Sequence, residues 1–326
     1  AEIGIRAMGG KYFPLKRGVP TGFNPFQFAP TAHNLQFCEK LVAQLVKNQG
    51  DETPILSAKE QQDISHAVRT VMSEAATREV RCLSLVLQNL PATGDNSLKA
   101  RLKKWTRGQP LGWAFDNPTD TQDFSGAMLF GYDYTEFLDD PEIRTPIMAY
   151  LLHITESLIT GDPFIYFMEE FWKPLQDPMF SEFALNKQKT IRKQSGLGVF
   201  VTQSPSDVLG HPIGKTMVEQ SVTQIFLPNP RADHDDYVHG FKVTESEYRI
   251  IKNLGEASRM FLVKQGRGSA IVRFDLGSMP DILNIISGTT ENVALLDSIR
   301  DEVGDAPEAW MPLLHQRIAT RRGLIK

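Results

Sequence analysis

The chain has 326 residues, of which 41% are hydrophobic, and this is enough to bury a substantial core in one large domain or two linked domains. Charged residues make up 23% of the sequence and the formal net charge is -4, so the overall charge does not indicate a nucleic-acid binder. No apolar run approaches the roughly 18 residues needed to span a bilayer. The two cysteines, Cys38 and Cys82, form no C-x-x-C pair and favour a reduced, cytosolic protein.

The first 30 residues are rich in glycine, proline and aromatic residues, and we expect short strands and turns there. From Thr31 onward, apolar residues recur at helical spacing. Helices are expected within 31–50, from Ser57 onward, within 82–90 and within 97–107. Ser57 and Glu60 have the spacing of a capping box. The sequence therefore predicts an all-helical segment over 31–125, inserted into an α/β domain.

From residue 127 the pattern alternates between strands and helices. Strands are expected at 127–133, 163–168, 197–201 and 223–227, with a closing pair at 260–263 and 270–274. Helices are expected at 141–158 and 181–194, and two or three more after Met279, with Trp310 as a packing anchor. Such alternation predicts a mostly parallel sheet covered by helices on both faces.

One stretch of this alternating region suggests a function. Six apolar or aromatic residues, 163–168, run directly into Glu169 and Glu170. The unbroken apolar run predicts a strand buried on both faces, with the two acids at the carboxyl edge of the sheet, where ligands bind in open α/β folds. In an ATPase, one acid holds the hydration shell of Mg²⁺ and the next activates the attacking water. The alternative is a core strand followed by a helix whose first residues are acidic.

A second polar group follows the next predicted strand. Gln203 comes two residues after the apolar run 197–201. Its amide could hydrogen-bond the γ-phosphate of ATP or the attacking water. The composition of 202–205 would also suit a simple turn. Taken with Glu169 and Glu170, the interpretation as an ATPase site is favoured.

In this order and spacing, several motifs resemble the motor core of the large ATPase of type IV secretion and conjugation systems. The motifs are Pro20-Thr21-Gly22-Phe23-Asn24-Pro25, Phe167-Met168-Glu169-Glu170-Phe171-Trp172-Lys173, Arg192-Lys193, Val201-Thr202-Gln203-Ser204-Pro205 and Phe261-Leu262-Val263-Lys264-Gln265-Gly266. The resemblance covers most of the chain. The family belongs to the RecA-like translocases, and its members carry a helical insertion before the acid-tipped strand.

The resemblance implies a RecA-like α/β fold and a division of the chain into four parts. These are the start of the core (1–30), the helical insertion (31–125), the rest of the core (126–300) and C-terminal helices packed on it (301–326). It also implies ATP hydrolysis with Mg²⁺, powering pilus assembly and substrate transfer. The expected setting is a homo-oligomeric, hexameric ring with other secretion subunits, at the cytoplasmic face of the bacterial inner membrane.

Two departures from the family pattern affect the site. The family usually has Asp followed by Glu, whereas the first acid here is Glu169, so its role as the Mg²⁺ ligand is less secure than the role of Glu170 as base. The phosphate-loop pattern G-x-x-x-x-G-K-[ST] does not occur; the run 210–216 is one residue short and is interpreted as a turn into a helix. Because the sequence begins at Ala1 without an initiator Met, we expect the true loop upstream, and this chain alone to be inactive.

Ring ATPases of this type often complete each site with an arginine from the neighbouring subunit. Arg192, just before the Gln203 strand, is the first candidate, and Arg267, on a turn flanked by glycines, is the second. Each could instead be a solvated surface charge. The alternatives for the whole protein are a DNA-translocating, coupling-type ATPase and a non-catalytic scaffold of the secretion channel.

Three further features receive structural interpretations. Asp233 to Asp236 with His239 are of metal-ligand type, but a solvated acidic loop is favoured. The basic residues of 99–107 around Trp105 could touch nucleic acid, although a solvated face is favoured. His153, within an apolar helix, is interpreted as a core histidine.

Overall fold

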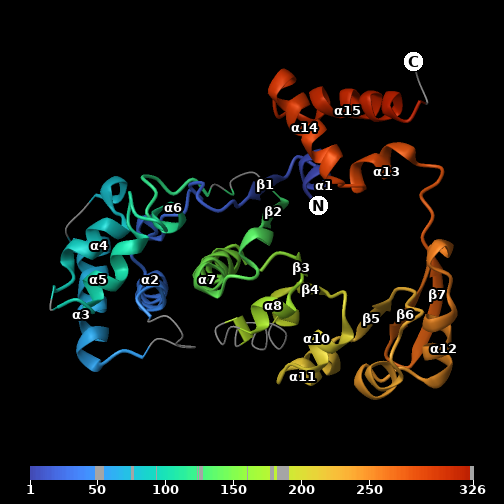
Figure 1. Cartoon of the computed structure of the whole chain (residues 1–326), viewed down its shortest axis with the longest axis horizontal. Helices are drawn as coiled ribbons and strands as arrows, with labels where there is room; N and C mark the ends of the chain where they lie inside the picture. The colour runs from blue at the N-terminus through green and yellow to red at the C-terminus, as the bar shows by residue number, and fades with distance from the viewer. Residues whose placement is uncertain are drawn as a thin grey trace.

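The structure is a computed structural model that describes residues 1–47, 55–74, 77–92, 94–122, 124, 128–159, 161–176, 180–181 and 191–323, without the side chains of Glu74 and Arg192. In Figure 1 the elements form a helical group, a central pair of parallel strands, a small antiparallel sheet and a C-terminal helical group.

The helical group contains α2 (Ala32–Leu45), α3 (Ala58–Arg69), α4 (Leu83–Asn89), α5 (Leu98–Leu102) and α6 (Gly112–Phe115) (Figure 1). The predicted helices are confirmed, although the fourth ends early and continues as a 3₁₀ turn, Lys103–Trp105. The predicted capping box is present: the N–H of Glu60 donates to the Ser57 hydroxyl at 3.2 Å, and the N–H of Ser57 donates to Glu60 Oε2 at 2.9 Å.

Helix α7 (Pro141–Ser157) packs against both the helical group and the strand region. Its residues from Ile143 to Ile154 are all buried. Its Tyr150 ring stacks on Phe23, with 4.1 Å between ring centroids. One hydrophobic core holds residues of α2–α7 together with Leu175 of α8 (Trp172–Leu175). Most of the buried residues of α7 are apolar, and both the helical group and the strand region enclose the helix.

The motif Pro20–Pro25 is a structural junction within this core. Both Phe23 and Asn24 are fully buried. The Asn24 amide donates to the carbonyls of Arg81 and Asn117, each at 2.8 Å. These bonds connect three separate stretches of chain, and the bond to the Asn117 carbonyl is buried. The motif therefore stabilises the helical group.

Strands β1 (Lys11–Pro14) and β2 (Phe130–Asp133) pair in parallel, as do β3 (Phe164–Glu169) and β4 (Gly196–Val201). Strands β5 (Thr223–Phe226), β6 (Met260–Gln265) and β7 (Gly268–Arg273) form an antiparallel sheet in that order. The predicted strands are thus confirmed, including the closing pair β6–β7. Among the described residues the strands form these three small sheets.

The expectation that β3 is buried on both faces is wrong. Its residues alternate, and Ile165 and Phe167 are 60% and 71% exposed. The other face carries Met168, which packs against the main core. An apolar run shows that both faces prefer an apolar neighbour, but it does not reveal whether this chain supplies that neighbour. No described residue buries the second face.

The expectation of only strands and turns before residue 30 is also wrong, because the chain opens with a helix, α1 (Glu2–Ala7). Its Ile3 is buried against α14 (Thr290–Val303) and α15 (Pro307–Arg321), which follow α13 (Pro280–Ile286). Figure 1 shows α1 beside these C-terminal helices. Tertiary packing thus favours a helix that local composition does not predict. Trp310 is fully buried in this cluster and is confirmed as a packing anchor.

Helix α12 (Glu245–Asn253) is linked to β6 by a buried ion pair between Glu247 and Lys264, with 2.7 Å between Oε2 and Nζ. Burial raises the pKa of Glu247, but hydrogen bonds from Lys264 and the N–H of Thr244 outweigh it, so the net pKa is lowered. The carboxylate therefore remains ionised through the neutral range.

Some predictions lie outside what the structure tests. The helix expected at 181–194 falls largely outside the described residues, which resume with a 3₁₀ turn, Ile191–Gln194. The four-part division of the chain stays a prediction.

Both cysteines are free thiols. Among the described helices, none combines the length and apolar character needed to cross a membrane.

We predict that Asn24→Ala lowers the free energy of unfolding by about 2–3 kcal/mol, because the buried Asn117 carbonyl and the partly buried Arg81 carbonyl lose their donor. Urea unfolding of the variant measures this loss. Asn253→Ala is the matched control, since that exposed amide only bonds within its own helix. Equal midpoints for the two variants would show that the junction does not stabilise the fold.

Lys264→Met should lower the free energy of unfolding by about 3 kcal/mol at neutral pH, because Glu247 is left charged and buried. At a pH above the pKa that Glu247 has in the unfolded chain, its lower pKa in the folded chain stabilises the fold. This stabilisation is lost as the pH falls through the pKa of Glu247 in the folded chain. The gap between wild type and variant should therefore shrink in acid. Lys215→Met, which removes an exposed pair, is the control and should change stability by less than about 1 kcal/mol. A gap independent of pH would contradict this account.

Candidate active site

The site lies where the parallel strands β3 and β4 end side by side. Glu169, the last residue of β3, is level with Val201, the last residue of β4. Glu170 and Gln203 follow these ends, and Gln203 Nε2 donates a hydrogen bond to Glu170 Oε1 at 2.5 Å. The structure thus brings together the acid and the amide that the sequence singles out.

A second donor holds the same carboxylate. Trp172 Nε1 donates to Glu170 Oε2 at 2.8 Å, so each carboxylate oxygen accepts one hydrogen bond. The next residue after Glu170, Phe171, is buried against Phe200 of β4, with 5.0 Å between ring centroids. The carboxylate is therefore oriented by two donors on a packed support. Sequence reasoning did not assign Trp172, although its place two residues after Glu170 was a usable signal.

The backbone at Glu170 has an unusual conformation. Its φ is +51°, in the left-handed region that residues with a Cβ seldom adopt. Such a conformation costs on the order of 1–3 kcal/mol and persists where the surrounding structure enforces it, often at functional sites. It ends the strand at Glu169 and redirects the Glu170 side chain toward β4. No sequence pattern indicates this turn.

Glu169 lies differently from Glu170. Its side chain is exposed and follows Ile165 and Phe167 on the open side of β3. Its carbonyl accepts a 3.4 Å hydrogen bond from the Tyr134 hydroxyl. Burial, with a smaller contribution from the Glu169 carboxylate, raises the pKa of Tyr134 to about 12, so this hydroxyl stays a donor at neutral pH. Tyr134 is a second supporting residue that sequence reasoning missed.

The two candidate arginines lie away from this pair of side chains. Arg192 belongs to the 3₁₀ turn before β4, at the opposite end of the strand from Gln203. Arg267 is exposed at the tip of the β6–β7 hairpin, next to Gly266 with φ of +58°. Neither is brought to Glu170 within the chain, and their roles stay predictions.

The run 210–216 is a turn after α10 (Pro205–Leu209) that leads into the first residues of α11 (Gly214–Gln220). A Cβ at Gly214 would lie 1.8 Å from the Val208 carbonyl oxygen, so the glycine serves close packing. Lys215 is exposed and faces Glu219 at 3.9 Å. A phosphate loop follows a strand, so this run is not one, as the sequence indicated.

The basic residues of 99–107 mostly make contacts within the chain. Arg101 pairs with Glu60, and Lys104 pairs with Glu142. Trp105 is buried and donates to the Leu45 carbonyl at 2.9 Å. These contacts give the segment a structural role and leave less free charge for nucleic acid.

His153 is confirmed as a core histidine. It is buried, stacks on Phe37 at 3.9 Å between centroids, and its Nε2 lies 2.8 Å from the Asn34 side-chain oxygen. Burial, with a smaller effect of His33, lowers its pKa to about 4, so the ring is neutral at physiological pH.

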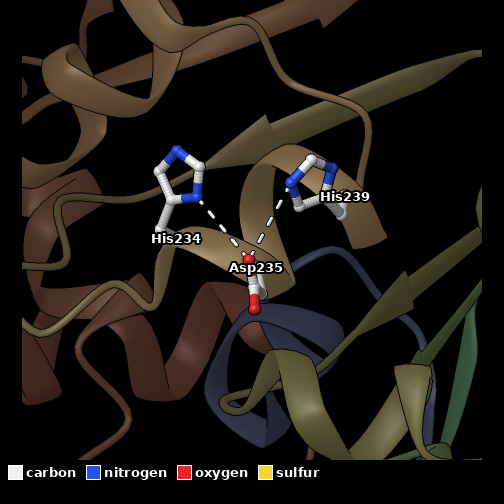
Figure 2. A group of neighbouring side chains, drawn as sticks. All are labelled: His234, Asp235 and His239. Atoms are coloured by element: carbon white, nitrogen blue, oxygen red, sulfur yellow. Dashed lines mark ion pairs between the residues drawn. The ribbon is translucent and has the colours of Figure 1, made fainter.

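The segment 233–239 contains a group of ligand-type side chains, shown in Figure 2. The side chains of His234, Asp235 and His239 lie together: His234 precedes a π-helical turn, Asp235–Gly240, Asp235 begins it and His239 lies near its end. Asp233 Oδ1 accepts the N–H groups of Asp235 and Asp236, at 2.9 and 3.1 Å, and so caps the turn. This group is separate from Glu170 and Gln203 in the sequence, and no part of the proposed ATPase chemistry uses it.

Comparisons with known proteins identify relatives of the chain. No protein-family model matches the sequence. Type IV secretion system protein VirB4 of Brucella suis is 48% identical over 328 aligned positions, covering 97% of this chain and 39% of that protein. Type IV secretion system protein PtlC of Bordetella pertussis is 42% identical over 325 positions, with the same coverage of 97% and 39%.

A solved structure shares the fold of the chain. The structure of VirB4 of Thermoanaerobacter pseudethanolicus matches with a TM-score of 0.63 and 16% identity, covering 84% of this chain and 78% of that one. The likeness confirms the predicted α/β fold. The chain spans 39% of the length of its curated relatives. Over nearly all of its own length, the chain is thus homologous to the corresponding parts of the VirB4 and PtlC proteins of type IV secretion systems.

Proposed function

We propose that this chain carries the hydrolytic half of an ATP site in a motor protein of a type IV secretion system. The observation that carries the proposal is the hydrogen bond between Gln203 and Glu170 across the ends of two parallel strands. In open α/β folds this edge is the place where ligands bind. The proposed work of the whole protein is to power pilus assembly and substrate transfer.

In the proposed mechanism, Glu170 is the base. The water that attacks the γ-phosphorus gives its proton to a Glu170 carboxylate oxygen, as the P–O bond to ADP breaks. Oε1 accepts from Gln203 in the present structure, so that oxygen becomes free when the amide turns to the γ-phosphate. The Gln203 amide would thus exchange Glu170 Oε1 for a γ-phosphate oxygen as its acceptor. Glu170 Oε1 would then be free to accept the proton only when ATP is bound.

Glu169 is suited to holding Mg²⁺. Its exposed carboxylate offers the oxygen ligand that Mg²⁺ prefers, and the glutamate arm can reach through a water molecule. Mg²⁺ would neutralise the charge that develops on the transferring phosphate. The described residues offer no glycine-rich loop with a lysine to hold the phosphates. We therefore propose that another part of a longer polypeptide supplies this loop and that the chain alone is inactive.

The open face of β3 supports this division of the site. Ile165 and Phe167 expose apolar surface there, together with Leu197 of β4. Exposed apolar patches of this kind mark surfaces that are covered in the assembled protein. We propose that the segment carrying the phosphate loop covers this face, and that subunits of the whole protein form a hexameric ring at the cytoplasmic face of the bacterial inner membrane with other secretion subunits.

The motor is favoured over the two alternatives by specific contacts. A DNA-translocating ATPase would need free basic side chains, but Arg101 and Lys104 pair with glutamates. A non-catalytic scaffold would not require Glu170 to adopt a strained backbone and to accept two oriented hydrogen bonds. DNA binding that weakens with salt would favour the first alternative.

We predict that Glu170→Gln in the full-length protein lowers kcat for ATP hydrolysis by about 10²- to 10⁴-fold, because the amide cannot accept the proton. ATP binding should persist, which a nucleotide-binding assay checks alongside the steady-state rate. Glu219→Gln, an exposed glutamate on α11, is the matched control and should keep the wild-type rate. An unchanged kcat in Glu170→Gln would exclude this residue as the base, whereas a full-length wild type that hydrolyses no ATP would favour the scaffold.

The arginine proposal is tested by mixing subunits. If Arg192 acts across the subunit interface, Arg192→Ala should reduce the ATPase rate by about 10³-fold or more. Mixing it with Glu170→Gln subunits should restore activity, since some sites then combine an intact arginine with an intact base. Arg267→Ala is tested in the same way, and Arg249→Ala, an exposed arginine of α12, is the control. Full activity of either candidate variant alone would clear that arginine of the role.

A further inference from the structure

The segment around His234 has a backbone that brings two histidines together. The turn Asp235–Gly240 is π-helical, and the N–H of Phe241 donates to the Asp236 carbonyl five residues earlier, at 2.9 Å. In an α-helix, residues five apart point about 140° away from each other, whereas a π turn places them on one side. Consequently the rings of His234 and His239 lie 5.8 Å apart between centroids. Single π turns often occur at functional sites.

The donor atoms of this group converge. His234 Nδ1 lies 3.7 Å from Asp235 Oδ1, and His239 Nε2 lies 3.9 Å from the same oxygen, as the dashed lines in Figure 2 show. All three donor atoms lie within 4.8 Å of one another. Bonds of about 2.0–2.2 Å to a tetrahedral ion would separate its ligands by roughly 3.3–3.5 Å. Asp235 and His239 are 85% and 71% exposed, so no packing opposes the small rotations that close this difference.

A carboxylate behind the group orients one of its ligands. Glu245 Oε1 lies 2.7 Å from His234 Nε2, and the ring also meets Tyr248 edge-on, at 5.1 Å between centroids. In neutral His234 this contact keeps the proton on Nε2 and leaves the Nδ1 lone pair facing Asp235. A carboxylate on the far nitrogen of a ligating histidine is the usual outer partner in metal sites.

We propose that His234, Asp235 and His239 bind a zinc-class divalent metal ion, with Glu245 as the outer partner of His234. Two imidazoles and one carboxylate suit Zn²⁺ or its first-row neighbours, whereas Mg²⁺ prefers oxygen ligands alone. Three protein ligands leave a fourth position for water or for a group from another molecule. The ion would link the π turn to the start of α12 through Glu245.

The test is equilibrium dialysis of the untagged chain against Zn²⁺, followed by metal analysis, at a pH above the titration range of histidine. Wild type and His66→Ala, which removes an exposed histidine of α3, should each retain one ion per chain. The variants His234→Ala and His239→Ala should lose it, and Glu245→Gln should weaken binding by about 10- to 100-fold. Binding should survive excess Mg²⁺.

The visible absorption of bound Co²⁺ provides an independent test of the site. Co²⁺ added to wild type should produce the visible absorption of a four-coordinate site, and His239→Ala should not. Circular dichroism checks that each variant is folded, and His239→Gln replaces His239→Ala if that variant is not. The proposal is overturned if the wild type retains no zinc, or if folded variants lacking His234 or His239 retain as much as wild type.

Discussion

The hydrogen bond between Glu170 and Gln203 depends on the register of β3 against β4. In that register Phe164 faces Gly196 and Tyr166 faces Gly198. A Cβ on Gly198 would lie 2.6 Å from the Tyr166 hydroxyl oxygen, so the aromatic ring occupies the space that the glycine leaves free. A shift of this register by one residue would move every side chain of the strand to the other face of the sheet. By favouring the observed register, these aromatic–glycine pairs place Glu170 close to Gln203.

The rest of the described structure supports that edge from one side. The main core continues from the helical group through α7 to Met168 and Phe200, so one face of the strand pair rests on packed side chains. The opposite face is apolar and exposed, which fits a chain that spans 39% of the length of its relatives. Under the proposed function, hydrolytic residues and phosphate-binding groups come from different parts of the polypeptide and meet at this face.

Sequence patterns predicted the features that depend on local periodicity. The strands, the helices of the helical group, the capping box at Ser57 and the proximity of Glu170 to Gln203 follow from spacing and from the shared edge of parallel strands. They did not predict helix α1, which forms because Ile3 packs against distant helices. Nor could they predict the left-handed Glu170 or the edge-to-face approach of His234 and His239, which depend on backbone conformations without a sequence signature.

The most direct test of the central claim is a structure of the full-length protein with Mg²⁺ and a non-hydrolysable ATP analogue. We expect the γ-phosphate at the ends of β3 and β4, with Gln203 Nε2 turned from Glu170 to a phosphate oxygen and a water beside the freed Oε1. A nucleotide bound away from this edge, with the bond between Gln203 and Glu170 unchanged, would contradict the account.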